Sequence, residues 1–395
     1  MSRQLNVLEI SKSTGGVGSY VRWLAQGFDH TRYKLTFVCL SDGGSELAAE
    51  LNQIAGVRAI SLQMNRYKID PFSDTRVLIQ LAQLMRREPF DLIHAHTSKP
   101  GYLARLAAIG TGIPVIYRPA CYAFHEGAGR AQRIITSTLE RFAARYLTAR
   151  IMTVSNDERD MGYRYGVGRA GQVVTIHTGI DPKPFDQPID RPALRATLGI
   201  PAEASVVGVV GRLIAQKAPL EFIRAVALVH QQHPAAHFVW IGDGPLEKPT
   251  KELVSTLGLE AIVHFAGLRR DIPAVLKALD IFVLPSHWEG FSLSVLEAMA
   301  AGLPIVASRV TGTSEAVAHG ESGLIVTKGA VDEMAQAISS LLADPARAQQ
   351  FGAKGRERIQ QLFTRERMIN QIAQLYDTVH TEYSQHLDPN RQITV

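Results

Sequence analysis

The sequence predicts an α/β protein built from two doubly wound, parallel-sheet domains. Short apolar runs alternate with helical patterns along the chain, and the alternation starts again after about residue 204. Continuous apolar strands between helices are typical of parallel sheets that are covered on both faces. The chain has 395 residues and is too long for one ordinary hydrophobic core. Each half is therefore expected to form its own sheet.

The predicted strands fall into two series of six. The first series consists of LNVLEI, KLTFVCL, FDLIHAH, PVIYR, IMTVS and VVTIH. The second series consists of SVVGVVG, HFVWIG, IVHFAG, IFVLP, PIVAS and GLIV. Between them lies GIDPKPFDQPIDRP, whose prolines leave little freedom for a helix or strand. This segment is the predicted linker.

The C-terminal sequence is helical from about Phe363 to Gln385 and contains no strand of its own. It is therefore expected to pack back on the first domain. The predicted domains are residues 1–185 and 186–362, followed by a crossing helix and tail over residues 363–395.

The distribution of charge along the chain indicates which kinds of binding partner to expect. The net charge is +5, but residues 1–185 hold 23 basic and 15 acidic residues, which give +8. The remaining 19 basic and 22 acidic residues give −3. A basic half favours phosphates, anionic lipid or nucleic acid. The sequence has no interleaving of aromatic and basic residues and no zinc-finger spacing, so nucleic acid is not expected.

Cysteine use and the first residues bear on the compartment. Cys39 and Cys121 offer no disulfide framework and no metal cluster, which fits a reducing cytoplasm. The start MSRQLNVLEI is too polar for a signal peptide, and no apolar run reaches membrane-spanning length. A cytoplasmic location is expected, with peripheral attachment to the inner face of the membrane as an option.

Two glycine turns are candidate anion sites. In STGGVGSY, Gly15 and Gly16 open a helix whose backbone N–H groups can point at an anion. The spacing is neither that of a P-loop nor that of a dinucleotide fingerprint, and such a turn can also merely ease packing. In GVVGRLIAQKAP, Arg212 can bind two phosphate oxygens and Lys217 adds a mobile charge. The alternative is a solvated basic turn.

Two glutamates stand eight positions apart in EGFSLSVLEAMAAG. A strand precedes the segment, Ser292 or Ser294 can cap a helix, and Gly302 can end it. Glu289 is then expected on the strand-to-helix loop and Glu297 one turn into the helix, both facing the crevice at the carboxyl end of the strand. Ionised carboxylates only accept hydrogen bonds, which suits a ligand rich in hydroxyls. The alternative is a pair of solvated helix charges.

Glycine turns in IGDGPLEK and FAGLRRDI add two more helix starts at the same edge of the second sheet. Cations, helix N-termini and carboxylates gathered at one edge match a nucleoside diphosphate that carries a sugar.

These motifs together resemble family 4 of the retaining glycosyltransferases, which have the GT-B fold. The resemblance covers nearly the whole chain and is most specific from GRLIAQK through GDGPL to GTSEAV. It implies two Rossmann-like domains that face a central cleft, and retaining hexosyl transfer from a nucleoside diphosphate sugar, expected to be a UDP-sugar. It also implies that no metal or other cofactor is needed.

The resemblance assigns roles to residues of this chain. Arg212 and Lys217 would hold the diphosphate and Glu289 the donor sugar, and these three are the predicted catalytic residues. Glu297 would hold the ribose hydroxyls. The predicted donor-binding residues are Gly15, Gly16, Gly242, Gly267, Arg269, Gly290, Phe291, Ser292 and Glu297.

The acceptor side is expected in the first domain. The segment DLIHAHTSKPGYLARLAA is similar to bacterial polysaccharide enzymes of the family. The predicted acceptor-side residues are His96, Ser98, Lys99 and His125. The pair His94 and His96, without further ligands, is weak evidence for a metal site.

Two departures from the family pattern put the donor identity in doubt. Many relatives carry histidine and glycine at the places of Ala120 and Cys121, and the histidine commonly meets the donor sugar. The nearest histidine here is His125. Thr178 also stands where asparagine is usual.

The acceptor is expected to be a saccharide, plausible as a polyprenyl-linked precursor of a cell-surface polysaccharide. Three alternatives stay open: a GT-B phosphorylase, a sugar-nucleotide epimerase, and a degenerate sugar-nucleotide-binding subunit. Ala120 favours the degenerate subunit, whereas the intact Arg212, Lys217, Glu289 and Glu297 argue against it.

One predicted helix suggests an anionic membrane surface as a further partner. The segment 129–150 carries five arginines and one acid, Glu140, and Ile134, Leu139 or Phe142, and Tyr146 recur at helical spacing. A basic amphipathic helix can lie on an anionic leaflet. Alternatively, the apolar stripe packs on the sheet of the first domain and the arginines are solvated.

Overall fold

The computed structural model describes residues 3–13, 15–65 and 70–386. The last part of the predicted tail, residues 387–395, and Thr14 of the first glycine turn lie outside the described residues. The chain forms two compact units, residues 1–177 with 365–395, and residues 178–364. The first crossing thus lies at 177/178 and not at the expected 185/186. The reason is a contact between distant parts of the sequence, because the N–H of Ile180 already donates to the carbonyl of Phe363 at 2.9 Å within the second unit.

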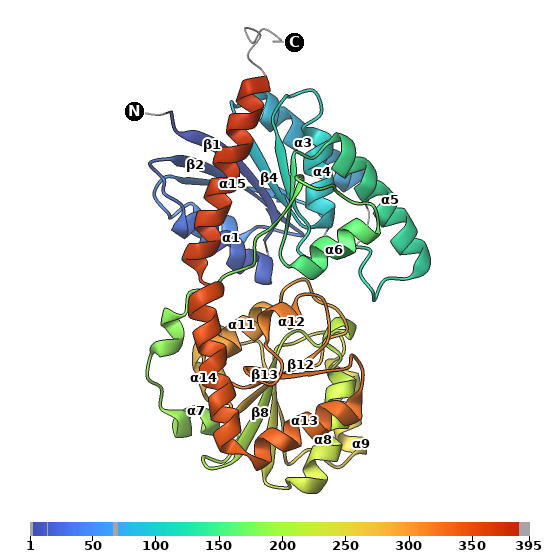
Figure 1. Cartoon of the computed structure of the whole chain (residues 1–395), viewed down its shortest axis with the longest axis vertical. Coiled ribbons are helices and arrows are strands. Elements are labelled where there is room, and N and C mark those ends of the chain that lie inside the picture. The colour runs from blue at the N-terminus through green and yellow to red at the C-terminus, as the bar shows by residue number, and fades with distance from the viewer. Residues whose placement is uncertain (1–2, 14, 66–69, 387–395) are drawn as a thin grey trace. The chain divides into compact units, whose positions relative to one another are not determined.

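The first unit contains a seven-stranded parallel sheet with the order β3-β2-β1-β4-β5-β6-β7 (Figure 1). The strands are β1 Leu5–Lys12, β2 Tyr33–Ser41, β3 Val57–Gln63, β4 Leu92–His96, β5 Val115–Arg118, β6 Arg150–Thr153 and β7 Val173–Thr175. Strand β3 was not predicted. It is an edge strand with no fully buried residue, so its sequence VRAISLQ lacks a continuous apolar run.

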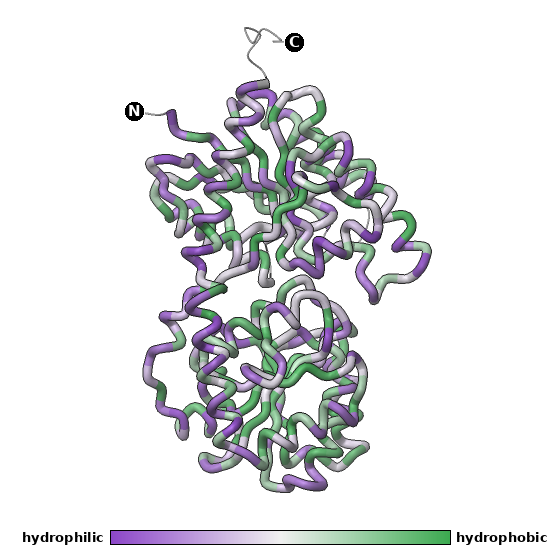
Figure 2. The backbone as a smooth tube through the Cα atoms, viewed as in Figure 1, coloured by the Kyte–Doolittle hydropathy of each residue, from purple (hydrophilic) through white to green (hydrophobic). Residues whose placement is uncertain are grey.

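Helices cover both faces of this sheet. They are α1 Gly16–Gly27, α2 Glu46–Leu51, α3 Pro71–Arg87, α4 Ser98–Ala107, α5 Arg130–Tyr146, α6 Asn156–Arg164 and α15 Arg365–His386. Helices α1, α2 and α15 share one hydrophobic core, and α3 and α4 share another on the opposite face. Figure 2 shows the hydrophobic strands in the interior of the unit.

Helix α15 packs on the first unit, as predicted. It buries Met368, Ile372, Tyr376 and Val379 in the same core as α1. The contact is close, because a Cβ atom on Gly27 would lie 2.0 Å from Cδ1 of Ile369. A larger residue at position 27 would therefore require the Ile369 side chain to move.

The second unit contains a six-stranded parallel sheet with the order β10-β9-β8-β11-β12-β13. All six strands were predicted: β8 Ser205–Val210, β9 Ala236–Ile241, β10 Val263–Gly267, β11 Ile281–Leu284, β12 Ile305–Ser308 and β13 Gly323–Val326. The 3-10 helices are η1 Lys183–Asp186 and η2 Ala215–Lys217. The α-helices are α7 Arg191–Thr197, α8 Pro219–Gln232, α9 Glu247–Thr256, α10 Ile272–Lys277, α11 Leu293–Ala300, α12 Thr313–Ala316, α13 Val331–Ala343 and α14 Pro345–Leu362.

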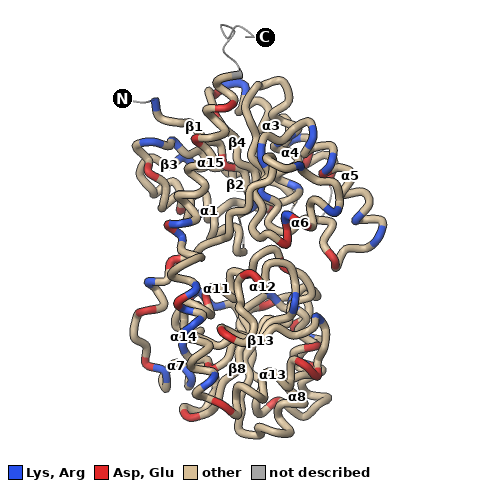
Figure 3. The backbone as a smooth tube through the Cα atoms, viewed as in Figure 1, with Lys and Arg blue, Asp and Glu red and all other residues tan. Residues whose placement is uncertain are grey.

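Each sheet reverses its strand order once, between β1 and β4 in the first unit and between β8 and β11 in the second. Ligands of doubly wound sheets bind at this switch point, outside the carboxyl ends of the strands. In Figure 3 charged residues lie on the helices and loops around the sheets, and the basic residues that recur along α5 are arginines. In the part of the chain that the structure describes, no helix is long and apolar enough to cross a membrane.

Candidate active site

The switch point of the second sheet brings together two of the predicted catalytic residues. Strands β8 and β11 pair directly, with Val207 opposite Ile281. The chain that leaves β8 carries Lys217, and the chain that leaves β11 carries Glu289. Lys217 Nζ lies 2.6 Å from Glu289 Oε1, and the two side chains are only 15% and 9% exposed. Residues 72 positions apart thus form a largely buried ion pair at the place where the fold binds ligands.

Gln216 connects the loop that follows β8 to the loop that follows β11. Its carbonyl accepts a hydrogen bond from the backbone N–H of His287 at 2.8 Å, and its Nε2 donates to the carbonyl of Trp288 at 2.9 Å. Both ends of this residue therefore hold the loop that carries Glu289. The sequence analysis did not identify Gln216, because nothing in IAQKAP distinguishes its amide from a solvated one.

The glycine turns at this edge pack backbone against backbone. A Cβ atom on Gly242 would lie 2.2 Å from the carbonyl oxygen of Gly211, which also accepts a hydrogen bond from Trp240 Nε1 at 2.8 Å. The N–H of Gly242 donates to the carbonyl of Gly267 at 2.7 Å. Both Gly242 and Gly267 have positive φ angles, of 132° and 61°, which favour glycine. These two predicted donor-binding glycines thus shape the turns.

The two predicted arginines differ in their surroundings. Arg212 is exposed, and its guanidinium makes no hydrogen bond or ion pair with any described residue. It is available to an anion at the end of β8. Arg269, predicted as a donor-binding residue, binds both carboxylate oxygens of Asp271 at 2.8 and 2.6 Å.

Helix α11 places the second glutamate as predicted. The helix begins at Leu293 after the N-cap Ser292, and Glu297 is its fifth residue, just over one turn in. Gly290, Phe291 and Ser292 before it are buried. The Glu297 carboxyl has no hydrogen-bond partner among the described residues, and burial raises its pKa to about 7. Such a carboxyl gains most from hydroxyl donors of a ligand.

In the first unit the predicted residues lie near the switch point of that sheet. Gly15 is the N-cap of α1 with φ 65°, and Gly16 is the first helical residue; both are exposed. Ser98 begins α4 directly after β4, and its N-cap Thr97 has the unusual φ of 64°. Lys99 is held by the Asp74 carboxylate at 2.6 Å and by the carbonyl of Asn65 at 2.7 Å.

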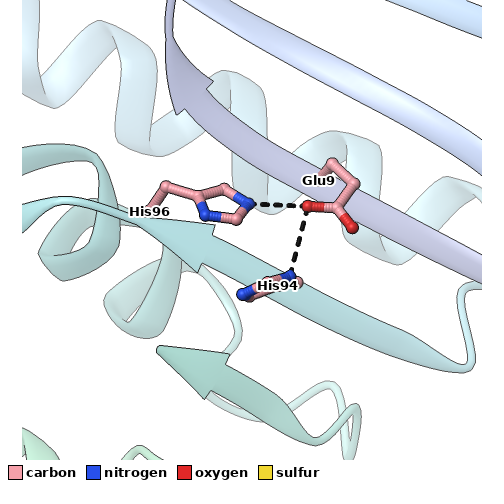
Figure 4. Close-up of side chains that lie close together, drawn as sticks. All are labelled: Glu9, His94 and His96. Atoms are coloured by element: carbon pink, nitrogen blue, oxygen red, sulfur yellow. Dashed lines mark hydrogen bonds and ion pairs between the residues drawn. The ribbon is translucent and has the colours of Figure 1, made fainter. Parts of the chain in front are cut away.

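His96 does not lie on an accessible surface. Glu9 on β1 faces His94 on β4, and all three side chains of Glu9, His94 and His96 are fully buried (Figure 4). His96 Nε2 donates to Glu9 Oε2 at 2.7 Å. His96 was predicted as an acceptor-side residue, but a side chain without exposed surface cannot itself touch an acceptor. A supporting role behind the β4–α4 turn fits better.

Tyr376 of helix α15 completes this buried cluster. Its hydroxyl donates to Glu9 Oε1 at 2.5 Å and lies 2.6 Å from His94 Nδ1. Burial alone would raise the pKa of Glu9, but the charge of His94 and hydrogen bonds from both histidines outweigh it and hold the pKa well below its usual range. The cluster therefore fastens α15 to the centre of the first sheet through an ionised carboxylate.

The ligand atoms of Glu9, His94 and His96 lie within 4.8 Å of one another, so they could in principle hold a metal ion. Glu9 supplies the third ligand that the sequence analysis did not find for the histidine pair. However, the protons of His94, His96 and Tyr376 already account for both carboxylate oxygens of Glu9. Hydrogen bonding therefore explains the arrangement without a metal.

The cluster predicts that acid destabilises the first unit. Burial and the charge of His94 lower the pKa of His96 from 6.5 to about 3. Between these values the unfolded state binds the proton and the folded state does not, so the free energy of unfolding decreases as pH falls below 6.5. At pH 5 the loss from His96 is on the order of 2 kcal/mol. The pKa of Glu9 is lower in the folded state than in the unfolded state, so Glu9 also reduces the free energy of unfolding, but only below about pH 4.5.

The variant His96→Gln keeps an N–H donor for Glu9 but cannot take up a proton. We expect its unfolding free energy, relative to the wild type, to increase by about 2 kcal/mol between pH 6.5 and 5. Amide exchange of the β4 segment is the readout, because Glu297 of the second unit titrates with the opposite sign. A difference between the two proteins that does not change with pH would contradict a neutral His96.

The loop after β5 holds two non-glycine residues in a backbone conformation that favours glycine. Ala120 and Cys121 have φ angles of 54° and 107°, which glycine adopts easily and other residues rarely do. The buried Glu158 compensates by accepting the N–H groups of Cys121 and Val154 at 2.5 and 2.9 Å. His125 follows in the same loop, where its Nδ1 accepts the N–H of Gly127. Burial and Arg133 lower the pKa of His125.

Comparisons with known proteins identify the family of the chain. Residues 190–358 match the family "Glycosyl transferases group 1", and residues 15–179 match the "Glycosyl transferase 4-like domain". A galactosyltransferase of Escherichia coli, named UDP-Gal:alpha-D-GlcNAc-diphosphoundecaprenol alpha-1,3-galactosyltransferase, is 32% identical over 293 residues, which is 73% of this chain and 76% of that protein. The chain belongs to the group 1 glycosyltransferases of family 4. It is thus a retaining glycosyltransferase.

Solved structures agree with the fold of this glycosyltransferase. Sucrose-phosphate synthase of Thermosynechococcus elongatus has a TM-score of 0.82 at 24% identity and covers 96% of this chain and 100% of its own. HepE of Anabaena, crystallised with UDP and glucose, has a TM-score of 0.82 at 24% identity and covers 95% and 100%. The predicted GT-B class is therefore confirmed, with sheets of seven and six strands.

Proposed function

We propose that this glycosyltransferase moves a sugar from a UDP-sugar to a saccharide carried on a polyprenyl diphosphate, in the synthesis of a cell-surface polysaccharide. The observation that carries the proposal is the Lys217–Glu289 pair at the switch point of the second sheet. Arg212 and Glu297 lie on the same two loop–helix segments. Cations suit the diphosphate and carboxylates suit the hydroxyls of sugar and ribose.

Donor binding would replace the ion pair between Lys217 and Glu289 with contacts from each residue to the donor. A diphosphate that reaches Lys217 competes with Glu289 for the ammonium group. Once released, the Glu289 carboxylate can accept hydrogen bonds from the hydroxyls of the donor sugar. The two roles are therefore coupled, because the phosphate that engages the cation also prepares the acid for the sugar.

The cations act mainly on the transition state. As the bond from the anomeric carbon to the β-phosphate breaks, positive charge develops on the sugar and negative charge on the leaving diphosphate. Arg212 and Lys217 stabilise that negative charge more strongly as it grows, which lowers the barrier. The leaving phosphate can take the proton of the acceptor hydroxyl on the same face. The configuration is then retained without a side-chain nucleophile.

The names of related proteins support the choice of substrates. The Escherichia coli relative is named for UDP-Gal and a diphosphoundecaprenol acceptor, and HepE was crystallised with UDP. A lipid-linked acceptor also agrees with the basic first half of the chain, since the acceptor carries a diphosphate.

A donor and acceptor panel tests the proposal. The full chain is incubated with several UDP-sugars, with and without GlcNAc-diphosphoundecaprenol, and UDP and the lipid product are measured. We expect one UDP-sugar to give UDP only when the acceptor is present, with a product of retained anomeric configuration. Interconversion of UDP-sugars without release of UDP would indicate an epimerase. An unchanged donor throughout the panel would indicate a binding subunit and contradict the proposal.

The two glutamates are expected to differ in role. Glu289→Gln should reduce turnover while UDP still binds, because the amide weakens the contact with the sugar and no longer competes with the diphosphate for Lys217. Glu297→Gln should weaken UDP binding itself, because the neutral amide offers the ribose hydroxyls one uncharged acceptor oxygen in place of the two oxygens of a carboxylate. Since the pKa of Glu297 is about 7, its share of the UDP affinity should increase from pH 6 to 8 in the wild type and vanish in Glu297→Gln. Calorimetry with UDP measures both effects, and the reverse pattern would exchange the two assignments.

A further inference from the structure

The outward face of helix α5 is apolar. Five of the twelve large hydrophobic side chains that are exposed in the described residues belong to this helix. They are Ile134, Ile135, Leu139, Phe142 and Tyr146, with exposed fractions from 43% to 64%. The sequence left two alternatives, a stripe packed on the sheet or a stripe that faces outward. The structure decides for the outward stripe.

A buried ion pair fixes which side of α5 faces the sheet. The inner face consists of small residues and Glu140, whose carboxylate receives Arg105 of α4 at 2.8 and 3.0 Å. The hydroxyl of Tyr117 on β5 also donates to Glu140 at 3.0 Å. Rotating the helix to bury the apolar stripe would break all three hydrogen bonds. The outward stripe is therefore a built feature of the fold.

The same arrangement removes the acidic charge from the outer face. Glu140 is the only acid between residues 130 and 146, and it points inward. Arg130, Arg141 and Arg145 are exposed and Arg133 is half-exposed. The basic residues coloured blue along α5 in Figure 3 are arginines. Within the described residues 130–146, the outer face thus carries apolar side chains and arginines but no acidic side chain.

We propose that the outer face of α5 docks on an anionic lipid bilayer. The helix has 17 residues and is about 25 Å long, which suits a helix lying in the interface with its apolar side chains among the acyl chains. The arginines then meet the lipid phosphates, and Tyr146 lies at headgroup depth. The docking goes beyond the transfer reaction, although the proposed lipid-linked acceptor would give it a purpose.

Charge distinguishes the bilayer from other occupants. A second copy of this face would bring two sets of four arginines together without any acid between them, which is repulsive. Nucleic acid would use the arginines but not the isoleucines and Phe142, since phosphate contacts need no apolar stripe. An anionic bilayer engages both kinds of side chain.

Vesicle sedimentation of the full chain tests the proposal. We expect the bound fraction to increase when phosphatidylglycerol is added to phosphatidylcholine vesicles and to decrease with salt. Changing Arg133, Arg141 and Arg145 to Glu should lower the partition coefficient by roughly 100-fold or more, because each lost cation costs about fivefold near an anionic surface and the new carboxylates are repelled by it. The matched control reverses three exposed cations of the second unit, Arg224, Lys248 and Arg347, and should bind as the wild type does.

The apolar half of the proposal needs its own variant. Ile135→Ser with Phe142→Ser should also reduce binding, and both side chains are exposed, so folding is expected to persist. Equal recovery of the wild type and both α5 variants in the supernatant of anionic vesicles at low salt would overturn the proposal. Equal losses in the α5 and control charge variants would overturn it as well, because net charge and not this face would then govern binding.

Transfer assays separate this proposal from the proposed function. The α5 variants should transfer sugar normally to a short-chain, water-soluble acceptor analogue and more slowly to the undecaprenyl acceptor in vesicles. Loss of transfer from every UDP-sugar in the wild type would contradict the proposed function and leave the vesicle result standing.

Discussion

Replacing Arg212 or Lys217 with alanine is expected to reduce turnover at least 100-fold. Both side chains extend from the loop after β8 at the switch point, where negative charge grows on the leaving diphosphate. Removal of one such stabilising contact costs on the order of 3 kcal/mol of transition-state stabilisation. Single-turnover rates with the UDP-sugar identified by the panel are the measurement. Arg224→Ala, which removes an exposed arginine from α8, is the matched control and should leave the rate unchanged.

The two variants should differ in stability, which separates catalysis from folding. Arg212 has no side-chain partner among the described residues, so its removal should leave the melting temperature unchanged. Removal of Lys217 leaves the buried Glu289 carboxylate without its cation and should lower the melting temperature. Near-normal rates in both single variants would refute the assigned diphosphate site. A lower melting temperature of Lys217→Ala with an unchanged turnover rate would indicate that the Lys217–Glu289 pair only stabilises the fold.

Breaking the pair between Arg105 and Glu140 should destabilise the first unit by about 3–5 kcal/mol. Arg105 is 1% exposed, and its guanidinium lies 3.8 Å from the ring centre of Tyr117 as well as on the Glu140 carboxylate. Arg105→Met would leave that carboxylate buried and unpaired. Amide exchange of the α4 and α5 segments should then accelerate.

The double variant Arg105→Met with Glu140→Leu serves as the control. It removes both charges together, and we expect it to recover most of the lost stability. Slow exchange in Arg105→Met itself would contradict the view that this pair sets the orientation of α5. The result bears on membrane docking, because the pair keeps the apolar stripe outward.

Much of the fold could be predicted because parallel sheets leave a strong signal. A strand that is covered on both faces reads as a continuous apolar run, and all twelve predicted runs are strands. Strand β3 escaped because it is an edge strand with only partly buried positions. The crossing at 177/178 was displaced because the contact of Ile180 with the distant Phe363 has no local signal.

The candidate site was predictable where spacing alone places a residue. A strand, a short loop and a capped helix determine that Glu289 lies on the loop and Glu297 one turn into α11. Contacts between distant positions were not predictable. Tyr376 reaches Glu9 across 367 positions, and this cluster explains why His96 is buried and not at an accessible surface. The pairing of Glu140 with Arg105 is of the same kind, and it determines which face of α5 is exposed.

A crystal structure of the protein with UDP tests the central claim most directly, namely that the switch point of the second sheet binds the donor diphosphate. We expect diphosphate oxygens within hydrogen-bonding distance of Lys217 Nζ and the Arg212 guanidinium, the ribose hydroxyls on Glu297, and the 2.6 Å contact between Lys217 and Glu289 broken. UDP bound elsewhere, with the Lys217–Glu289 pair intact, would contradict the assignment of this site.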